Sequence, residues 1–139
     1  MTDEELDERC AEVMDALEHT GGPYDAILLD APCSATGTIR RRPDIPWTKS
    51  DADVASLAKL QHALLRNAAG QLRPGGVLVY SVCSLEEDEG PRQIAQLLGD
   101  DATLERLPVT EAELGFPALS AKGGAVPAVL PDGDVQTLP

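Results

Sequence analysis

Residues 24–34 read Tyr-Asp-Ala-Ile-Leu-Leu-Asp-Ala-Pro-Cys-Ser, and this stretch decides the fold predicted for the chain. Its apolar run, Ala26–Leu29, is short and continuous and ends at a carboxylate, Asp30. Such a run is typical of a strand that is buried on both faces of a parallel sheet. Pro32 cannot continue the hydrogen-bonded ladder, so Cys33 is expected just beyond the carboxyl end of the strand.

A second apolar run, Val77–Val82, has the same form and also leads into a cysteine, Cys83. A strand–helix–strand unit places its strands parallel and side by side through a right-handed crossover. Neighbouring strands lie about 4.8 Å apart, and ligands of open α/β sheets bind beyond the carboxyl ends of the strands. We therefore expect an α/β fold in which Asp30, Cys33 and Cys83 converge on one site.

Composition limits the class of protein. The chain has 139 residues, enough for one domain with its own core, and a formal net charge of -13, which is unfavourable for nucleic-acid binding on bulk electrostatics. No apolar run is long enough to span a bilayer, and the acidic N-terminus lacks a signal-peptide pattern. The 3 cysteines do not form a disulfide framework or a zinc-ligand pattern, so we expect free thiols, no metal site and a cytoplasmic location.

Two long helices are predicted before and between the strands. Thr2–His19 has an apolar stripe and an acidic face, which is typical of a solvated surface helix. Ser50–Leu72 has a continuous apolar face, and Ser50 with Asp53 matches the acidic form of a capping box. The second helix therefore forms the crossover between the two strands.

A third helix begins after Cys83 at one of two positions. Ser84 with Glu87 would form a capping box, but Pro91 would then lie inside the helix. A start nearer Gly90 places Pro91 in the first turn, where proline is favoured. With either start we expect Cys83 just before the helix, a setting that lowers the pKa of a thiol.

The segment Ala35–Lys49 has no periodicity and is predicted to be a loop. Arg40, Arg41 and Arg42 make it the basic island of an acidic chain. This pattern fits phosphate contacts and solvated ion pairs about equally well. Trp47 either stacks on a base or pins the loop to the core, and the second use is the more common.

The pattern weakens from Asp101 onward. Thr103–Val109 and Ala125–Leu130 are predicted as strands, and Ala118–Gly124 as a loop. The chain stops without a closing helix or apolar strand, so we expect it to be a piece of a larger protein.

Two thiols beside a carboxylate permit covalent chemistry. One thiolate can act as a nucleophile, and the carboxylate can hold or protonate an electron-poor ring. Either cysteine alone would be better explained as a buried, inert thiol. Their common position at the strand ends favours a functional pair, and a disulfide between them is disfavoured in the cytoplasm.

Several motifs follow one another in a specific order: Asp30-Ala31-Pro32-Cys33-Ser34, Thr36-Gly37-Thr38-Ile39-Arg40-Arg41, Pro43-Asp44-Ile45-Pro46-Trp47, Gln61, Leu72-Arg73-Pro74-Gly75-Gly76 and Tyr80-Ser81-Val82-Cys83-Ser84. Together they closely resemble the catalytic half of the Fmu/Sun-type RNA (cytosine-5) methyltransferases. The resemblance covers about residues 24–98 and is strongest to the bacterial members that act on small-subunit rRNA. It implies a Rossmann-like, mostly parallel sheet of the class I methyltransferases, which use S-adenosylmethionine.

The resemblance also implies roles for individual residues. Cys83 matches the nucleophile that adds to carbon-6 of the target cytosine, after which carbon-5 takes the methyl group. Cys33 matches the cysteine that assists release of the product, and Asp30 matches an aspartate between methyl donor and base. The resemblance thus implies that these three residues are catalytic and that Asp30 also contacts the cofactor. We further expect Pro32 and Arg40–Arg42 to contact RNA, whose target base has to leave its stack.

Some features depart from the family pattern. Val82 and Ala35 stand where the family usually has threonine and glycine. The Gly-rich loop and the acidic residue that hold the cofactor are expected before Tyr24, and an Asp-Gly-Phe-Phe segment after Pro139. We therefore expect residues 1–139 to be the C-terminal part of a methyltransferase catalytic domain that by itself binds S-adenosylmethionine weakly or not at all.

Two other functions stay open on the sequence. A methyltransferase acting on an exocyclic nitrogen also places Asp-x-Pro after a strand, but it would not need Cys83. A non-catalytic segment that binds RNA or protein would form no covalent adduct and would bind no cofactor.

Overall fold

The computed structural model describes the chain except residues 1, 115–119, 122–123, 126–128 and 137–139. The chain forms two compact units, Met1–Asp100 and Asp101–Pro139. The first unit contains every residue for which the sequence predicts a functional role. Among the described helices, none is both long and apolar enough to cross a membrane.

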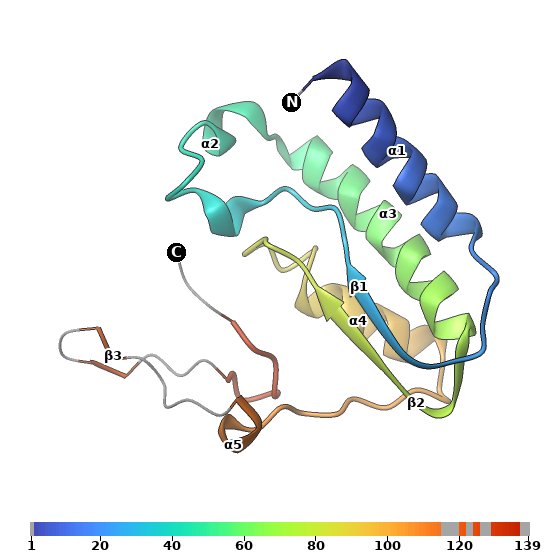
Figure 1. The fold of residues 1–139 in the computed structure, drawn as a ribbon. Coiled ribbons are helices and arrows are strands. Elements are labelled where there is room, and N and C mark those ends of the chain that lie inside the picture. Colours follow the sequence, from blue (N-terminus) through green and yellow to red (C-terminus); the bar gives the residue numbers. More distant parts are fainter. Residues whose placement is uncertain (1, 115–119, 122–123, 126–128, 137–139) are drawn as a thin grey trace. The chain divides into compact units, whose positions relative to one another are not determined.

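The first unit is an α/β arrangement around a pair of parallel strands (Figure 1). In β1 and β2, Ile27 pairs with Leu78 and Asp30 pairs with Ser81. This confirms the predicted parallel neighbours joined by a helical crossover. The elements of this unit are α1 (Asp3–Glu18), β1 (Tyr24–Asp30), η1 (Thr36–Thr38), α2 (Ile45–Thr48), α3 (Asp51–Gly70), β2 (Leu72–Ser81) and α4 (Pro91–Asp100).

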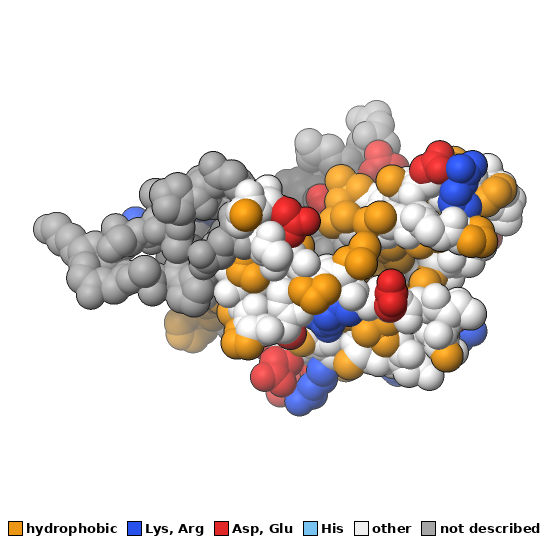
Figure 2. Space-filling model, turned by 90° about the horizontal axis from the view of Figure 1, so that it is seen from below, with side chains coloured by type: hydrophobic (Ala, Val, Ile, Leu, Met, Phe, Trp, Pro, Cys, Tyr) orange, Lys and Arg blue, Asp and Glu red, His pale blue; other side chains and the backbone are white. Residues whose placement is uncertain are grey.

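The core of this unit lies around α3, which contacts both strands as well as α1 and α4. Leu64 and Leu65 of α3 and Leu97 of α4 are buried. The opposite face of the sheet is open: Leu28 is 72% exposed and Val79 is 52% exposed. The prediction that the strands are buried on both faces is therefore wrong for this chain, because the described helices leave one apolar face uncovered. Figure 2 shows hydrophobic side chains reaching the surface in several places.

Both ends of the crossover helix follow from local chemistry. Ser50 Oγ accepts a hydrogen bond from the Asp53 N–H at 3.3 Å, and Asp53 Oδ2 accepts one from the Ser50 N–H at 2.8 Å. This reciprocal pair confirms the predicted capping box. Past the end of the helix, Gly75 has a φ of 79°, which glycine tolerates better than other residues.

Helix α4 begins at Pro91, which confirms the later of its two predicted starts. Residues 84–90 thus separate Cys83 from the helix. The expectation that Cys83 lies at the positive end of this helix is wrong, because the field of a helix terminus falls off within its first turn.

The predicted loop Ala35–Lys49 contains two short helical pieces, η1 and α2. Ile45 is the buried residue of α2 and anchors this segment to the unit. The absence of a long period in the sequence hid both pieces, because each is about one turn long.

The second unit has little regular structure. Its elements are α5 (Glu111–Leu114) and an antiparallel pair, β3 (Ser120–Ala121) with β4 (Gly124–Ala125). The predicted strand Thr103–Val109 is not formed, and its last residue instead donates its N–H to the Gly133 carbonyl at 3.0 Å. Within the predicted loop Ala118–Gly124, the described residues form a short ladder rather than a loop.

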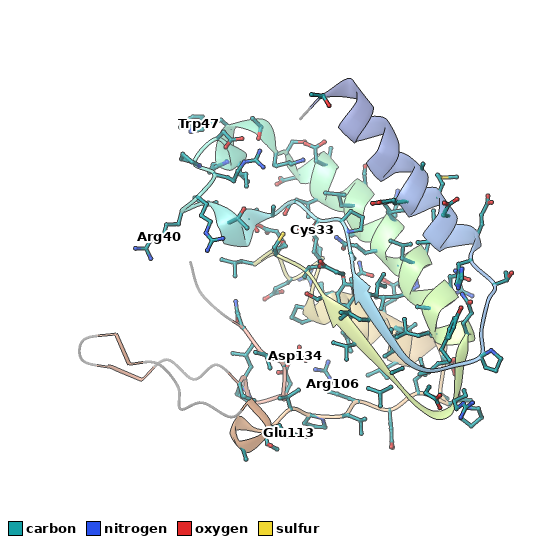
Figure 3. The ribbon with its side chains drawn as sticks, in the orientation of Figure 1. Cys33, Arg40, Trp47, Arg106, Glu113 and Asp134 are labelled. Atoms are coloured by element: carbon teal, nitrogen blue, oxygen red, sulfur yellow. The ribbon has the colours of Figure 1, made fainter. Side chains whose placement is uncertain are left out.

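The predicted strand Ala125–Leu130 is described only in part, because residues 126–128 lie outside the described residues. Ala125 ends β4, and Val129 forms an isolated bridge with Val135. Arg106 pairs with Asp134 at 2.5 Å within the same unit (Figure 3).

Two leucines provide a matched test of this core. Leu65→Ala should lower the free energy of unfolding by about 2–5 kcal/mol, because Leu65 is 0% exposed and its truncation leaves a cavity. Leu28→Ala makes the same change on the open sheet face and should cost less than about 1 kcal/mol. Urea unfolding measures both, and equal losses would contradict this placement of the core.

Candidate active site

The register of the two strands brings their ends to one place. Asp30 and Ser81 are the last paired residues, and the Ala31 N–H still donates to the Ser81 carbonyl at 3.0 Å. Both chain segments leave the sheet at this edge. The sulfur atoms of Cys33 and Cys83, which are 50 residues apart in sequence, lie 3.2 Å from each other. This confirms the predicted convergence of the two thiols, and Asp30 ends β1 at the same edge with its side chain exposed.

Contacts between the two loops hold this arrangement. The Gly37 N–H donates to the Cys83 carbonyl at 3.1 Å, and a Cβ at position 37 would lie 3.0 Å from that oxygen. The Leu85 N–H donates to Thr36 Oγ1 at 3.0 Å. Glycine at position 37 therefore allows the close approach of backbone to backbone that aligns the cysteines.

Ala35 has a φ of 60° and starts the turn that follows Cys33. This left-handed conformation costs a residue with a Cβ roughly 1–2 kcal/mol. A physical reason for the glycine usual in the family is now visible, since glycine adopts this conformation without strain.

The two cysteines have unlike surroundings. Burial and the hydrogen bond with Cys83 raise the pKa of Cys33 to about 12, whereas Cys83 is exposed. Cys33 therefore remains a protonated thiol near neutral pH and can donate its S–H toward the Cys83 sulfur. Cys83 is thus the more exposed of the two residues.

A buried polar cluster lies beneath the cysteine loops. Ser34, Gln61 and Glu89 are each 0% exposed, and Glu89 accepts hydrogen bonds from Ser34 and Gln61. Burial and the nearby acidic groups Cys33 and Glu89 raise the pKa of Tyr80, whose hydroxyl donates to the Glu89 carbonyl at 2.6 Å. No function was predicted for this cluster from the sequence. The signal that could have pointed to it is the serine that directly follows each site cysteine.

The basic loop lies outside the cluster and projects into solvent (Figure 3). Arg40 and Arg41 are exposed, and their side chains have no ion pair among the described residues, whereas Arg42 pairs with Asp44 at 3.3 Å. Trp47 is 88% exposed. The expectation that Trp47 pins the loop to the core is therefore wrong, because Ile45 takes that position.

Pro32 is half-buried, and its carbonyl accepts a hydrogen bond from Gln61 Nε2 at 2.8 Å. The protein itself thus occupies the backbone acceptor of Pro32. This hydrogen bond ties the residue before Cys33 to the crossover helix.

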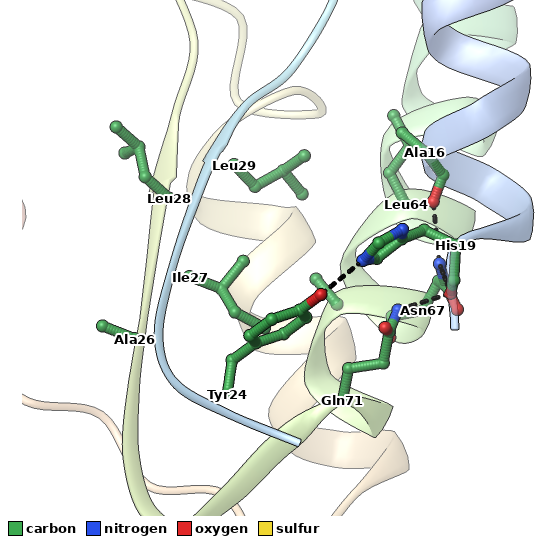
Figure 4. A pocket seen from close by; sticks show the side chains of 11 residues that line it. Ala16, His19, Tyr24, Ala26, Ile27, Leu28, Leu29, Leu64, Asn67 and Gln71 are labelled. Atoms are coloured by element: carbon green, nitrogen blue, oxygen red, sulfur yellow. Dashed lines mark hydrogen bonds between the residues drawn. The ribbon is translucent and has the colours of Figure 1, made fainter. Parts of the chain in front are cut away.

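A cavity of about 310 Å³ lies between α1, β1 and α3 (Figure 4). His19 Nε2 and the Tyr24 hydroxyl form a hydrogen bond of 2.8 Å beside it. The residues that line the cavity include neither site cysteine and not Asp30. It is therefore separate from the cysteine pair.

Comparisons with known proteins agree with the motifs. Residues 6–133 match the family model described as 16S rRNA methyltransferase RsmB/F. The chain is 56% identical over 75 residues to "Ribosomal RNA small subunit methyltransferase B" of Klebsiella pneumoniae subsp. pneumoniae, covering 54% of this chain and 17% of that protein. It is 42% identical over 118 residues to the protein of the same name from Pasteurella multocida, covering 82% of this chain and 26% of that protein.

A solved structure shares the fold. The chain superposes on the crystal structure of PH0851 with a TM-score of 0.61 and 33% sequence identity, covering 63% of this chain and 20% of that one. The chain thus spans about a quarter or less of the length of each of these relatives. Because the family match extends over most of its residues and the parallel α/β fold agrees with it, the chain belongs to the RsmB/F family of 16S rRNA methyltransferases.

Proposed function

We propose that this chain carries the reaction centre of an enzyme that methylates carbon-5 of a cytosine in small-subunit rRNA. The observation that carries the proposal is the 3.2 Å separation of the Cys33 and Cys83 sulfurs at the edge where β1 and β2 end. Membership of the RsmB/F family supports the rRNA substrate. On this proposal, residues 1–139 are the C-terminal part of the catalytic domain, and the two free thiols fit the reducing cytoplasm.

In the first step Cys83, the more exposed of the two cysteines, is the nucleophile. Its thiolate forms a bond to carbon-6 of the cytosine, and the electron pair of the C5–C6 double bond makes carbon-5 nucleophilic, as in an enamine. When bound, S-adenosylmethionine supplies an electrophilic methyl group, which carbon-5 accepts. An unactivated ring carbon would be too poor a nucleophile for that transfer.

The second step releases the product. The hydrogen on carbon-5 leaves as a proton to water, its electron pair re-forms the C5–C6 double bond, and the C6–S bond breaks with its pair on the Cys83 sulfur. Cys33, whose pKa is raised to about 12, donates an S–H hydrogen bond to that departing sulfur. Cys33 thereby assists elimination without competing as a nucleophile.

Asp30 is the residue of this chain that fits S-adenosylmethionine. Its exposed carboxylate has no hydrogen bond or ion pair within the described part of the chain, and the cofactor carries positive sulfonium and ammonium groups. The cavity between α1, β1 and α3 is not at this edge. We infer that the chain contributes one contact to the cofactor and binds it weakly on its own.

The basic loop is the part of this chain that suits RNA. Arg40 and Arg41 can contact phosphates, and Arg42 can do so if it leaves Asp44. Trp47 presents an exposed ring on which an unpaired base can stack, and Pro32 directly precedes Cys33 in the chain. These contacts are local, so they can operate despite the net charge of -13.

Covalent trapping tests the mechanism in a full-length methyltransferase that carries residues 24–98 in place of the matching segment of the Pasteurella relative. RNA with 5-fluorocytosine should give an adduct stable to denaturing electrophoresis, because fluorine cannot leave carbon-5 as the proton does. Cys83→Ser should abolish the adduct, and Cys33→Ala should let an adduct with ordinary RNA accumulate.

Each alternative function has its own outcome in that experiment. Methylation by Cys83→Ser at the parent rate would support an exocyclic-nitrogen methyltransferase and overturn the proposed mechanism. If the full-length protein with both cysteines intact gives no adduct and no methylation, residues 24–98 would instead be a non-catalytic segment that binds RNA or protein.

Thiol alkylation tests the assigned roles in this chain directly. At pH 8, iodoacetamide should modify Cys83 at least about tenfold faster than Cys33, because a pKa of about 12 leaves only about one Cys33 in 10⁴ as thiolate. Raising the pH toward the Cys33 pKa should increase its rate. Peptide mass spectrometry measures both sites, and faster alkylation of Cys33 at pH 8 would reverse the roles.

Trp47 is the single tryptophan of the 139-residue sequence, so tryptophan fluorescence measures RNA binding at this loop. Single-stranded cytosine-rich RNA at low salt should quench the emission as a base stacks on the ring. Arg40→Ala should weaken the binding, whereas Arg66→Ala, an exposed arginine on α3, should not. Unchanged emission up to about 1 mM RNA would contradict a stacking role.

A further inference from the structure

Glu89 is a fully buried carboxyl group that the mechanism above does not use. Its two carboxyl oxygens accept hydrogen bonds from the segment that follows Cys33 and from the segment that follows Cys83. Ser34 donates from its backbone N–H at 2.8 Å and from its hydroxyl at 2.5 Å, and the Ser84 hydroxyl donates to the same carboxyl group. One side chain thus joins two segments that are distant in sequence.

The points of attachment are adjacent to the reacting groups. Ser34 directly follows Cys33, and Ser84 directly follows Cys83. Glu89 therefore holds each cysteine through the residue next to it in the chain. The repeated Cys-Ser pair has a physical explanation here, because each serine supplies a hydroxyl to the common acceptor.

Glu89 is itself fixed from two further elements. Gln61 of α3 donates through Nε2 to Glu89 Oε1 at 3.1 Å and to the Pro32 carbonyl at 2.8 Å. The Tyr80 hydroxyl of β2 donates to the Glu89 backbone carbonyl at 2.6 Å. The acceptor for both serines is thus tied to the crossover helix and to the sheet.

We propose that Glu89 is a positioning residue that sets the separation of the Cys33 and Cys83 sulfurs by accepting hydrogen bonds from Ser34 and Ser84. The significance of this role for methylation rests on the proposed function, whereas the role itself concerns thiol geometry alone. Burying a carboxyl group is costly, and an apolar contact could pack the two loops with less desolvation. Hydrogen bonds add direction, which a separation as short as 3.2 Å requires.

Disulfide exchange with glutathione measures this geometry without RNA or cofactor. In a Cys10→Ser background of the 139-residue chain, oxidised glutathione takes two electrons from the Cys33–Cys83 pair and is reduced to two molecules of glutathione. The equilibrium ratio gives the effective concentration of one thiol at the other. Glu89→Gln should lower it by about tenfold or more, because the amide replaces one acceptor with a donor that faces other donors.

Asp88→Asn is the matched control, because it makes the same chemical change one residue away. Asp88 is exposed and pairs with Arg92 at 2.6 Å. In the Asp88→Asn variant, the effective concentration of one thiol at the other should therefore stay within about twofold of the value for the Cys10→Ser protein. Ser84→Ala removes the hydroxyl that donates to Glu89 and that also contacts the Ser34 and Thr36 hydroxyls and the Glu86 N–H. Because both hydrogen bonds from Ser34 to Glu89 remain, it should give a smaller loss than Glu89→Gln. It is also the deciding variant if circular dichroism shows that Glu89→Gln does not fold.

A purely structural role predicts a different result. Glu89→Gln would then lower the midpoint of thermal unfolding while the effective concentration of the folded protein stays at the parent value, and this outcome overturns the proposal. Ser84→Ala with an unchanged effective concentration would overturn it as well. Failure of covalent trapping alongside a clear loss in glutathione exchange would reject the proposed function and leave the positioning role intact.

Discussion

The parallel pairing of β1 with β2 is the constraint on which the site depends. The two cysteines belong to loops that leave the sheet together, because Asp30 is paired with Ser81. A slip of one residue along a strand moves the chain by about 3.3 Å and turns every side chain to the other face. That step is as large as the 3.2 Å between the sulfurs, so only this register brings them into contact.

Local pattern and the handedness of crossovers were enough to predict this frame. Two apolar runs with a long amphipathic segment between them leave one favoured arrangement, and their ends had to meet. Coverage of the sheet could not be predicted in the same way. The run Ala26–Leu29 indicates that both faces are apolar, but not which elements pack on each, and Leu28 is 72% exposed. The expectation that Cys83 lies just before a helix was wrong for a related reason. The helix begins at Pro91, and the acidic residues between Cys83 and Pro91 do not by themselves indicate where it starts.

Glu89 and Trp47 show where residue type misleads. Glu89 stands in an acidic run whose neighbours Glu87 and Asp88 pair with Arg92 at the surface, and nothing local distinguishes the buried member. Trp47 is two residues from Ile45 on α2, a rotation of about 200° on a helix. The two side chains therefore face opposite ways, and burial of Ile45 leaves Trp47 in solvent. Which of two apolar residues faces inward depends on tertiary contacts, not on size.

Placing two thiols in contact creates a risk that the structure also limits. The closeness that would let Cys33 assist a departing sulfur would also let the pair oxidise to a disulfide. Exchange requires a thiolate as the attacking group. Burial and the hydrogen bond with Cys83 raise the pKa of Cys33 to about 12, which keeps it protonated and makes it a poor attacker. The half-buried position of Cys33 thus gives the two sulfurs different roles and slows the oxidation that their proximity favours. The proposed chemistry therefore requires the difference between the two cysteines as much as it requires the short distance between their sulfurs.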